Sequence, residues 1–60
     1  SYEDLVVKLI RNKYSLNEEL AILRKNYNET TNEFYIYNAY VEQCKLDAKA
    51  FIEERNNVLK

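Results

Sequence analysis

Apolar residues in the second half of the chain recur at alternating steps of three and four. Beginning at Phe34, these steps visit Tyr37, Val41, Cys44, Ala48, Phe51, Arg55 and Val58, and only Arg55 breaks the apolar pattern. This heptad spacing places its members along one side of a helix. Thr30 and Glu33 have the spacing of a capping box, which marks a helix start. The pattern therefore predicts one long helix over about 31–58.

The first half of the chain has the same apolar spacing. Its members are Tyr2, Val6, Leu9, Lys13, Leu16, Leu20, Leu23 and Tyr27, of which only Lys13 is charged. This pattern favours one continuous helix over about 2–27, followed by a turn at about 28–30. Ser15 and Glu18 have a second capping-box spacing, however, and could start a new helix after Tyr14. A break at Ser15, which would give three helices, stays open as the alternative.

The two apolar stripes match each other if the chain turns at Asn28-Glu29 and folds back as an antiparallel hairpin. Leu23 then faces Phe34, and each later pair follows in step. The hairpin seam predicted in this way consists of Val6, Leu9, Leu16, Leu20, Leu23, Phe34, Tyr37, Val41, Cys44, Ala48 and Phe51. The expected fold class is all-α, with residues 1–60 forming one coiled-coil-like helical hairpin.

Large apolar residues also lie outside this seam. They are Leu5, Ile10, Ile22, Tyr35, Ile36, Tyr40, Ile52 and Leu59. A two-helix rod would leave them in water, and exposed apolar surface of that extent is typical of an interaction site. Two hairpins packed as a four-helix bundle would cover it. We therefore expect a homodimer, with Tyr35 and Tyr40 on its second surface.

Composition supports this interpretation. Sixty residues allow one domain with a small core, and the complete absence of glycine and proline permits long uninterrupted helices. Hydrophobic residues make up 47% of the chain and the net charge is −1, values that fit neither a disordered tail nor a general binder of polyanions. We therefore expect protein partners, beginning with a second copy of the chain.

Candidate chemistry is sparse. Cys44 lies in the seam, and the chain has no histidine that could act as its base, so we interpret it as a small buried hydrophobe. Lys13 falls opposite Cys44 and could lower the pKa of the thiol, although snorkelling out of the seam is the simpler interpretation. With no histidine and one cysteine, the usual zinc sites are out of reach. We predict no enzyme activity, no cofactor, and no catalytic, cofactor-binding or metal site.

One cysteine cannot form an intrachain disulfide, which favours a reducing compartment such as the cytoplasm. The sequence shows neither a membrane-spanning apolar run nor a signal-peptide pattern, so we expect no membrane partner. Basic and aromatic residues of the first half suggest a nucleic-acid strip as an alternative; they are Arg11, Lys13, Tyr14, Arg24, Lys25 and Tyr27. Acidic residues balance the basic ones there, five against five in residues 1–30, which argues against a phosphate-binding surface.

The segments YSLNEELAILRKN and EFYIYNAYVEQCKLDAK resemble short uncharacterised proteins encoded by phages and prophages of low-GC Gram-positive bacteria. The resemblance covers about residues 14–49 and rests mainly on the Glu-Leu-Ala-x-Leu-Arg run at 19–24 and on Tyr-Asn-Ala-Tyr at 37–40. It implies a phage or prophage origin and a place in the bacterial cytoplasm or the virion. It brings no activity and no functional site.

The leading hypothesis from the sequence is a non-enzymatic, self-associating helical interaction or assembly module. Two alternatives remain. One is a small nucleic-acid-binding regulator that uses the basic side of the first helix, and the other is an inhibitor that binds one host protein through Tyr35 and Tyr40. Besides a second copy of the chain, the expected partners are a phage or host protein.

Overall fold

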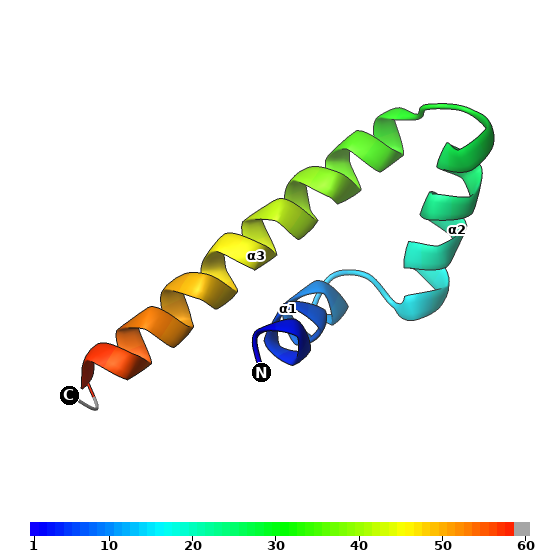
Figure 1. The fold of residues 1–60 in the computed structure, drawn as a ribbon. Coiled ribbons are helices and arrows are strands. Elements are labelled where there is room, and N and C mark those ends of the chain that lie inside the picture. Colours follow the sequence, from blue (N-terminus) through cyan, green and yellow to red (C-terminus); the bar gives the residue numbers. More distant parts are fainter. Residues whose placement is uncertain (59–60) are drawn as a thin grey trace.

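The computed structural model describes residues 1–58, which form three α-helices. They are α1 (Tyr2–Arg11), α2 (Leu16–Asn28) and α3 (Asn32–Val58). α1 crosses α3 obliquely near the middle of α3 (Figure 1). α2 contacts the N-terminal part of α3, and the two helices diverge from the turn that joins them. The all-α, hairpin-like fold class is confirmed. The side chain of Val58, a member of the predicted stripe, and Leu59, predicted outside the seam, lie outside the described part.

The first half of the chain contains two helices, so the prediction of one continuous helix over 2–27 is wrong and the alternative break at Ser15 is confirmed. Ser15 has an extended backbone, with ψ at 164°, immediately before α2. Its hydroxyl accepts a hydrogen bond from the Glu18 amide at 3.1 Å, and the Glu18 carboxylate accepts one from the Ser15 amide at 2.9 Å. This complete capping box satisfies two backbone donors that have no partner within α2, and so stabilises the start of a new helix.

α3 begins one residue later than the pattern predicts. The Thr31 hydroxyl accepts a hydrogen bond from the Phe34 amide at 3.0 Å, so Thr31 has the capping role that we assigned to Thr30. From Asn32 the helix continues without interruption to Val58. An uninterrupted helix is possible because the segment contains no glycine or proline to weaken it.

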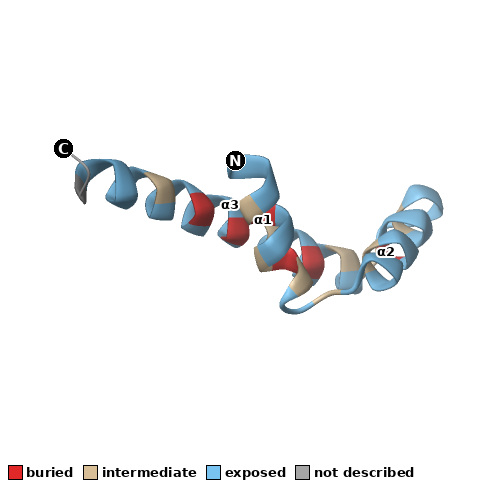
Figure 2. Ribbon diagram, turned by 90° about the horizontal axis from the view of Figure 1, so that it is seen from below, coloured by how far each residue is buried: buried red, intermediate tan, exposed pale blue. Residues whose placement is uncertain are grey.

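The core of the molecule lies where α1 crosses α3. Val6 and Ile10 from α1 meet Cys44 and Ala48 from α3, and each pair is one helical turn apart. Figure 2 shows most of the buried positions near this crossing, with exposed positions along most of the rest of the molecule. Around the cluster pack five half-buried residues: Leu5, Leu9, Tyr14, Tyr40 and Val41. α1 therefore buries the Val6–Ile10 side, whereas the predicted seam assigned Leu9 to the centre of the contact.

Candidate interaction surface

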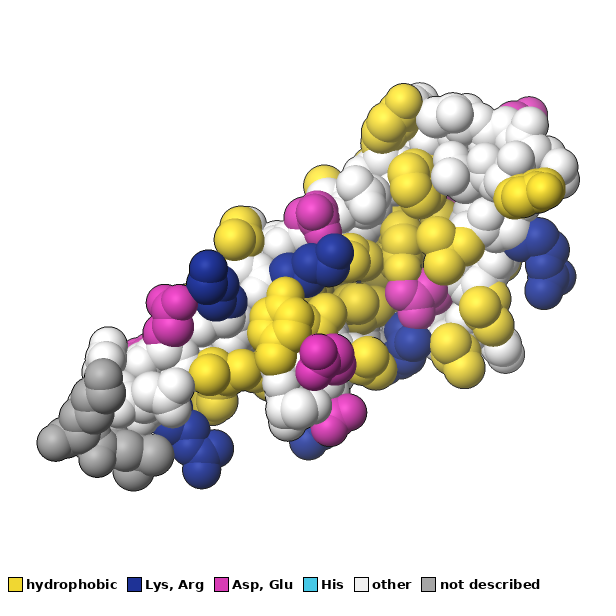
Figure 3. Space-filling model, in the orientation of Figure 1, with side chains coloured by type: hydrophobic (Ala, Val, Ile, Leu, Met, Phe, Trp, Pro, Cys, Tyr) yellow, Lys and Arg dark blue, Asp and Glu magenta, His cyan; other side chains and the backbone are white. Residues whose placement is uncertain are grey.

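α2 leaves its most apolar side uncovered. Leu16, Leu20 and Leu23 are 54%, 46% and 41% exposed, and Tyr27 is 89% exposed. Their spacing of four, three and four residues places them along one side of the helix. We call these four residues the α2 leucine stripe. In Figure 3 hydrophobic side chains continue from the centre of the molecule onto α2. A monomer therefore presents a row of apolar side chains to water.

The side of α2 that faces α3 carries polar groups. Ile22 is its one buried residue, and Glu19 and Asn26, three and four positions away from Ile22, are half-buried. Residues at these spacings share one helical face. The predicted pairing of Leu16, Leu20 and Leu23 with α3 is therefore wrong, because α2 is rotated about its axis so that Glu19 and Ile22 point toward α3.

A polar junction explains this rotation. One Glu19 oxygen accepts a hydrogen bond from the Arg11 guanidinium at 2.7 Å, and the other accepts one from the Tyr37 hydroxyl. A second Arg11 nitrogen lies 3.4 Å from the Tyr14 carbonyl oxygen. The carboxylate of α2 thus connects α1 and α3. Because hydrogen bonds to charged groups are stronger than neutral ones, this junction favours the orientation in which Glu19 faces inward.

The junction changes the titration of its members. Burial alone would raise the pKa of the Glu19 carboxyl, but the hydrogen bonds from Tyr37 and Arg11 hold its pKa below the ordinary value. Burial, together with the hydrogen bond to Glu19, raises the pKa of the Tyr37 hydroxyl well above its ordinary range. Glu19 is therefore charged and Tyr37 neutral near pH 7, which is the state in which Tyr37 donates and Glu19 accepts.

Tyr40 belongs to the packing within the chain. Its hydroxyl donates a hydrogen bond to the Leu9 carbonyl at 3.1 Å, and its ring lies edge-on to Tyr14 with 5.7 Å between centroids. The Lys13 ammonium lies 5.0 Å from the centroid of the Tyr40 ring, a cation–π distance. Tyr40 is therefore half-buried and stabilises the contact of α1 with α3, while its place on an intermolecular surface stays a prediction.

The predicted hairpin seam falls into three groups. Its buried members are Val6, Tyr37, Cys44 and Ala48, and its half-buried members are Leu9, Phe34 and Val41. Its exposed members are Leu16, Leu20, Leu23 and Phe51. The seam is thus a good description of the middle of α3 and a poor one of α2.

The predicted self-association surface is also divided by the structure. Ile10 and Ile22 are buried within the chain, and Leu5, Tyr40 and Ile52 are half-buried. Assigning Ile10 and Ile22 to an outer surface is therefore wrong, because both face α3 in the observed rotation of α1 and α2. Tyr35 and Ile36 are exposed, at 61% and 60%.

Cys44 is a buried free thiol of the core. Burial raises the pKa of the Cys44 thiol above its ordinary value, which disfavours the reactive thiolate. Lys13, which we placed opposite Cys44, lies instead over the rings of Tyr14 and Tyr40. The suggestion that Lys13 lowers the pKa of this thiol is therefore wrong.

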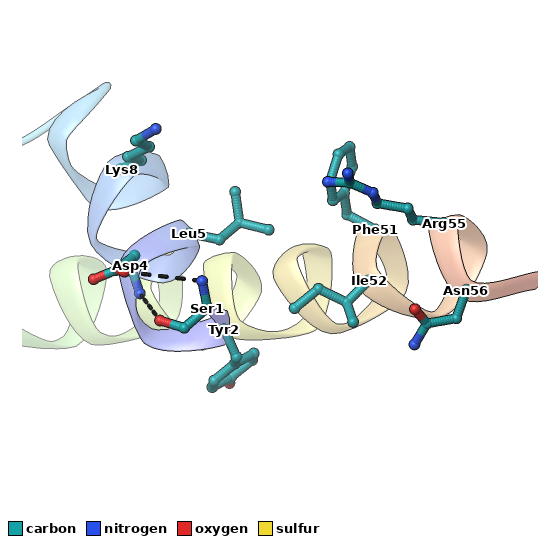
Figure 4. Close-up of a pocket in the computed structure, with 9 residues that line it drawn as sticks. All are labelled: Ser1, Tyr2, Asp4, Leu5, Lys8, Phe51, Ile52, Arg55 and Asn56. Carbon is teal, nitrogen blue, oxygen red and sulfur yellow. Dashed lines mark hydrogen bonds and ion pairs between the residues drawn. The ribbon is translucent and has the colours of Figure 1, made fainter. Parts of the chain in front are cut away.

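An open groove of about 600 Å³ separates the start of α1 from the C-terminal part of α3. Leu5, Phe51 and Ile52 supply its apolar lining, and Lys8 and Arg55 lie at its edges (Figure 4). Within residues 1–58 the structure brings together no group of three His, Cys, Asp or Glu side chains able to hold a metal ion. None of the helices in that part of the chain has the length and apolarity needed to cross a membrane.

Sequence reasoning missed the junction of Arg11, Glu19 and Tyr37. Arg11 and Glu19 are eight residues apart on opposite sides of the Ser15 break, so no helical spacing connects them. The capping box at Ser15 was the one local signal, because a separate α2 can rotate independently of α1. Comparison with known proteins finds no family model, no curated protein and no solved structure that matches this chain.

Proposed function

We propose that this chain is a non-enzymatic helical interaction module that self-associates, and that its association covers the α2 leucine stripe. The observation that carries the proposal is the exposure of Leu16, Leu20, Leu23 and Tyr27 along one side of a single well-capped helix. Exposed apolar rows of this kind mark surfaces at which a protein meets a partner. We also propose a phage or prophage setting, which is supported only by the sequence resemblance described above.

The rest of the molecule supports an interaction role for α2. α1 packs against α3 with its own apolar side inward, so that crossing supplies the fixed core. Glu19 connects α2 to Arg11 of α1 and Tyr37 of α3, Ile22 is buried, and the leucines of α2 stay exposed. A rigid helix that presents three or four apolar residues at helical spacing suits helix–helix recognition, as in bundles and helix-in-groove complexes.

Sedimentation of a concentration series tests this proposal, with Leu20→Glu as the disrupting variant. As its concentration rises, we expect the mass of the native protein to increase from that of one chain to that of two or more. Leu20→Glu should need a concentration more than tenfold higher to associate to the same extent. Burying one leucine is worth about 1.5–3 kcal/mol, and about 1.4 kcal/mol corresponds to a factor of ten. A mass of one chain at every concentration of the native protein would contradict the proposal.

Leu46→Glu is the matched control. Leu46 is 62% exposed, and it lies two residues from buried Cys44, which places it on the far side of α3 from the core. This variant introduces the same charge at an exposed leucine outside the α2 leucine stripe. We expect it to associate as the native chain does, with the helix content of both variants unchanged in circular dichroism.

A further inference from the structure

α2 begins as a helix in its own right, separate from α1. The C-terminal end of α1 is completed first, because the Lys13 and Tyr14 amides both donate to the Ile10 carbonyl, at 3.0 and 2.9 Å. The capping box of Ser15 and Glu18 then satisfies the first donors of α2. In the part of the chain that the structure describes, no backbone hydrogen bond joins α1 to α2. The connection between Tyr14 and Ser15 can therefore act as a hinge.

The other end of α2 is also completed within its own segment. The Glu29 amide donates to the Lys25 carbonyl at 3.2 Å, which closes the last turn of α2. α3 has a separate cap, in which the Phe34 amide donates to the Thr31 hydroxyl at 3.0 Å. A movement of α2 as one body would therefore break no backbone hydrogen bond of α1 or α3.

Few buried groups attach α2 to the rest of the molecule. The described core cluster takes its members from α1, α3 and Tyr14, and none of them belongs to α2. Ile22 is the one buried residue of α2, and Glu19 bonds to Arg11 and Tyr37. The Glu19 side chain is 15% exposed and the Arg11 side chain 31%, so water screens their attraction only in part. The charge of Glu19 is therefore a main part of what holds α2 in place.

The groups that face Glu19 make its charge decisive. From α1 it faces the Arg11 guanidinium, and from α3 it faces the Tyr37 hydroxyl. The Tyr37 ring lies edge-on to Tyr14, with 5.2 Å between centroids, and the Lys13 ammonium lies 5.7 Å from the centroid of the Tyr14 ring. A neutral Glu19 would leave Arg11 without its counter-ion and keep only a weaker hydrogen bond with Tyr37. Losing this charge therefore removes the strongest link between α2 and the other helices.

We propose that the polar junction is a charge-dependent latch, and that neutralising Glu19 releases α2 as a unit while α1 stays packed against α3. The crossing of α1 with α3 keeps its own contacts when α2 moves, because the described core cluster contains no residue of α2. The connections at both ends of α2 let it turn without cost to the backbone hydrogen bonds of its neighbours. This inference goes beyond the proposed self-association and does not depend on it.

Distances between pairs of spin labels test this proposal. Both pairs are made on a Cys44→Ala background, so that the labels are attached only at the chosen positions. Lys25→Cys with Lys49→Cys reports on α2 relative to α3, and Lys8→Cys with Asn38→Cys reports on α1 relative to α3. All four chosen side chains are exposed. The labelled protein is mixed with an excess of unlabelled chain, so that only distances within one chain are measured.

Glu19→Lys is the disrupting variant, because it places a second cation beside Arg11. We expect the α2–α3 distances to be narrowly distributed in the native chain and broad in Glu19→Lys, while the α1–α3 distances stay narrow in both. The ratio of released to latched molecules should rise by at least about tenfold. Adding Arg11→Glu to Glu19→Lys restores opposite charges and should narrow the α2–α3 distances again. Glu53→Lys, at an exposed carboxylate of α3, is the matched control and should leave both distributions native.

Three results would overturn the latch. The first is a narrow α2–α3 distribution in Glu19→Lys, and the second is broadening of both pairs together, which would show that α2 and the core separate as one unit. The third is broadening that Arg11→Glu does not reverse, because charge pairing would then not be its cause. A broad α2–α3 distribution with Glu19 intact would likewise show that the junction does not hold α2.

Acidification of the native chain is a second test. Burial raises the pKa of the Glu19 carboxyl, but the hydrogen bonds from Tyr37 and Arg11 outweigh this effect and keep the pKa below its ordinary value of 4.5. The latch should therefore hold near pH 7 and open as the pH falls through the folded value. The α2–α3 distances should broaden at a higher pH than the α1–α3 distances; simultaneous broadening would overturn a separate release of α2.

Discussion

α1 and α2 are both short amphipathic helices that pack against α3, yet α1 buries an entirely apolar side whereas α2 buries a side that mixes apolar and polar residues. α1 buries Val6 and Ile10, while α2 buries Ile22 beside the half-buried Glu19. The difference lies in what α3 offers at each place. Opposite α1 it presents the small side chains of Cys44 and Ala48, whose size permits close approach of two helices.

Opposite α2, α3 presents the hydroxyl of Tyr37, which donates to Glu19. A buried hydroxyl requires a hydrogen-bond partner, and a leucine cannot supply one. Satisfying Tyr37 therefore turns Glu19 of α2 inward and leaves the leucines of α2 exposed. The chemistry of the partner surface, as well as the apolar content of the helix, decides which side of an amphipathic helix is buried.

The largest effect is expected for Ile10→Ala in α1. The substitution removes a buried side chain from the crossing with α3 and should lower the free energy of unfolding by about 2–4 kcal/mol. That is a large part of the stability of so small a domain. Leu16→Ala on α2 is the matched control, because Leu16 is 54% exposed, and should change stability by less than about 0.5 kcal/mol.

Urea unfolding, followed by circular dichroism at a concentration where the chain is monomeric, measures both variants. Equal destabilisation by the two substitutions would show that the leucine of α2 is buried in the monomer, contrary to the orientation described above.

A smaller effect is expected for Glu19→Gln, which removes the charge from the polar junction. Loss of charge-assisted hydrogen bonds should cost about 1–3 kcal/mol near pH 7. The pKa of Glu19 is lowered in the folded state, so its contribution is present above the ordinary pKa of 4.5 and is lost as the pH falls through the folded value. The variant should therefore lose less stability on acidification than the native chain.

Thermal unfolding at a series of pH values below 5 measures this difference. Some dependence should remain in Glu19→Gln, because hydrogen bonding to the Ser15 amide also lowers the pKa of Glu18. Glu53→Gln, at an exposed carboxylate of α3 outside its first turn, is the control for removing one carboxylate, and it should change stability less than Glu19→Gln does. A native acid profile in Glu19→Gln would rule out the junction as a source of the pH dependence.

The smallest effect is expected for Ser15→Ala, which removes the hydroxyl that caps α2. Loss of an N-cap costs about 1 kcal/mol, and here the loss should be confined to α2, because α1 ends before this residue. Ser15→Asp keeps an acceptor at the cap and should restore most of the loss. Hydrogen exchange resolved by residue should show that Ser15→Ala accelerates amide exchange in α2 more than in α1, relative to the native chain. Equal acceleration in both helices would indicate that they unfold as one unit.

Much of the secondary structure could be predicted from local sequence. The capping boxes, the apolar repeat and the lack of glycine and proline indicate helices, and Ser15 with Glu18 indicates the position of the break. The repeat also places Cys44 and Ala48 on the buried side of α3. These features were predictable because each depends on residues within one or two helical turns.

The sequence by itself determined that the chain is helical, where its helices can start, and that α2 carries an apolar stripe. Only the tertiary structure decided which way that stripe faces. The apolar spacing of α2 is the same whether the helix continues α1 or stands alone, so the pattern cannot report a rotation about the helix axis. That rotation was set by Arg11 and Tyr37, which meet Glu19 across three helices and share no sequence spacing with it.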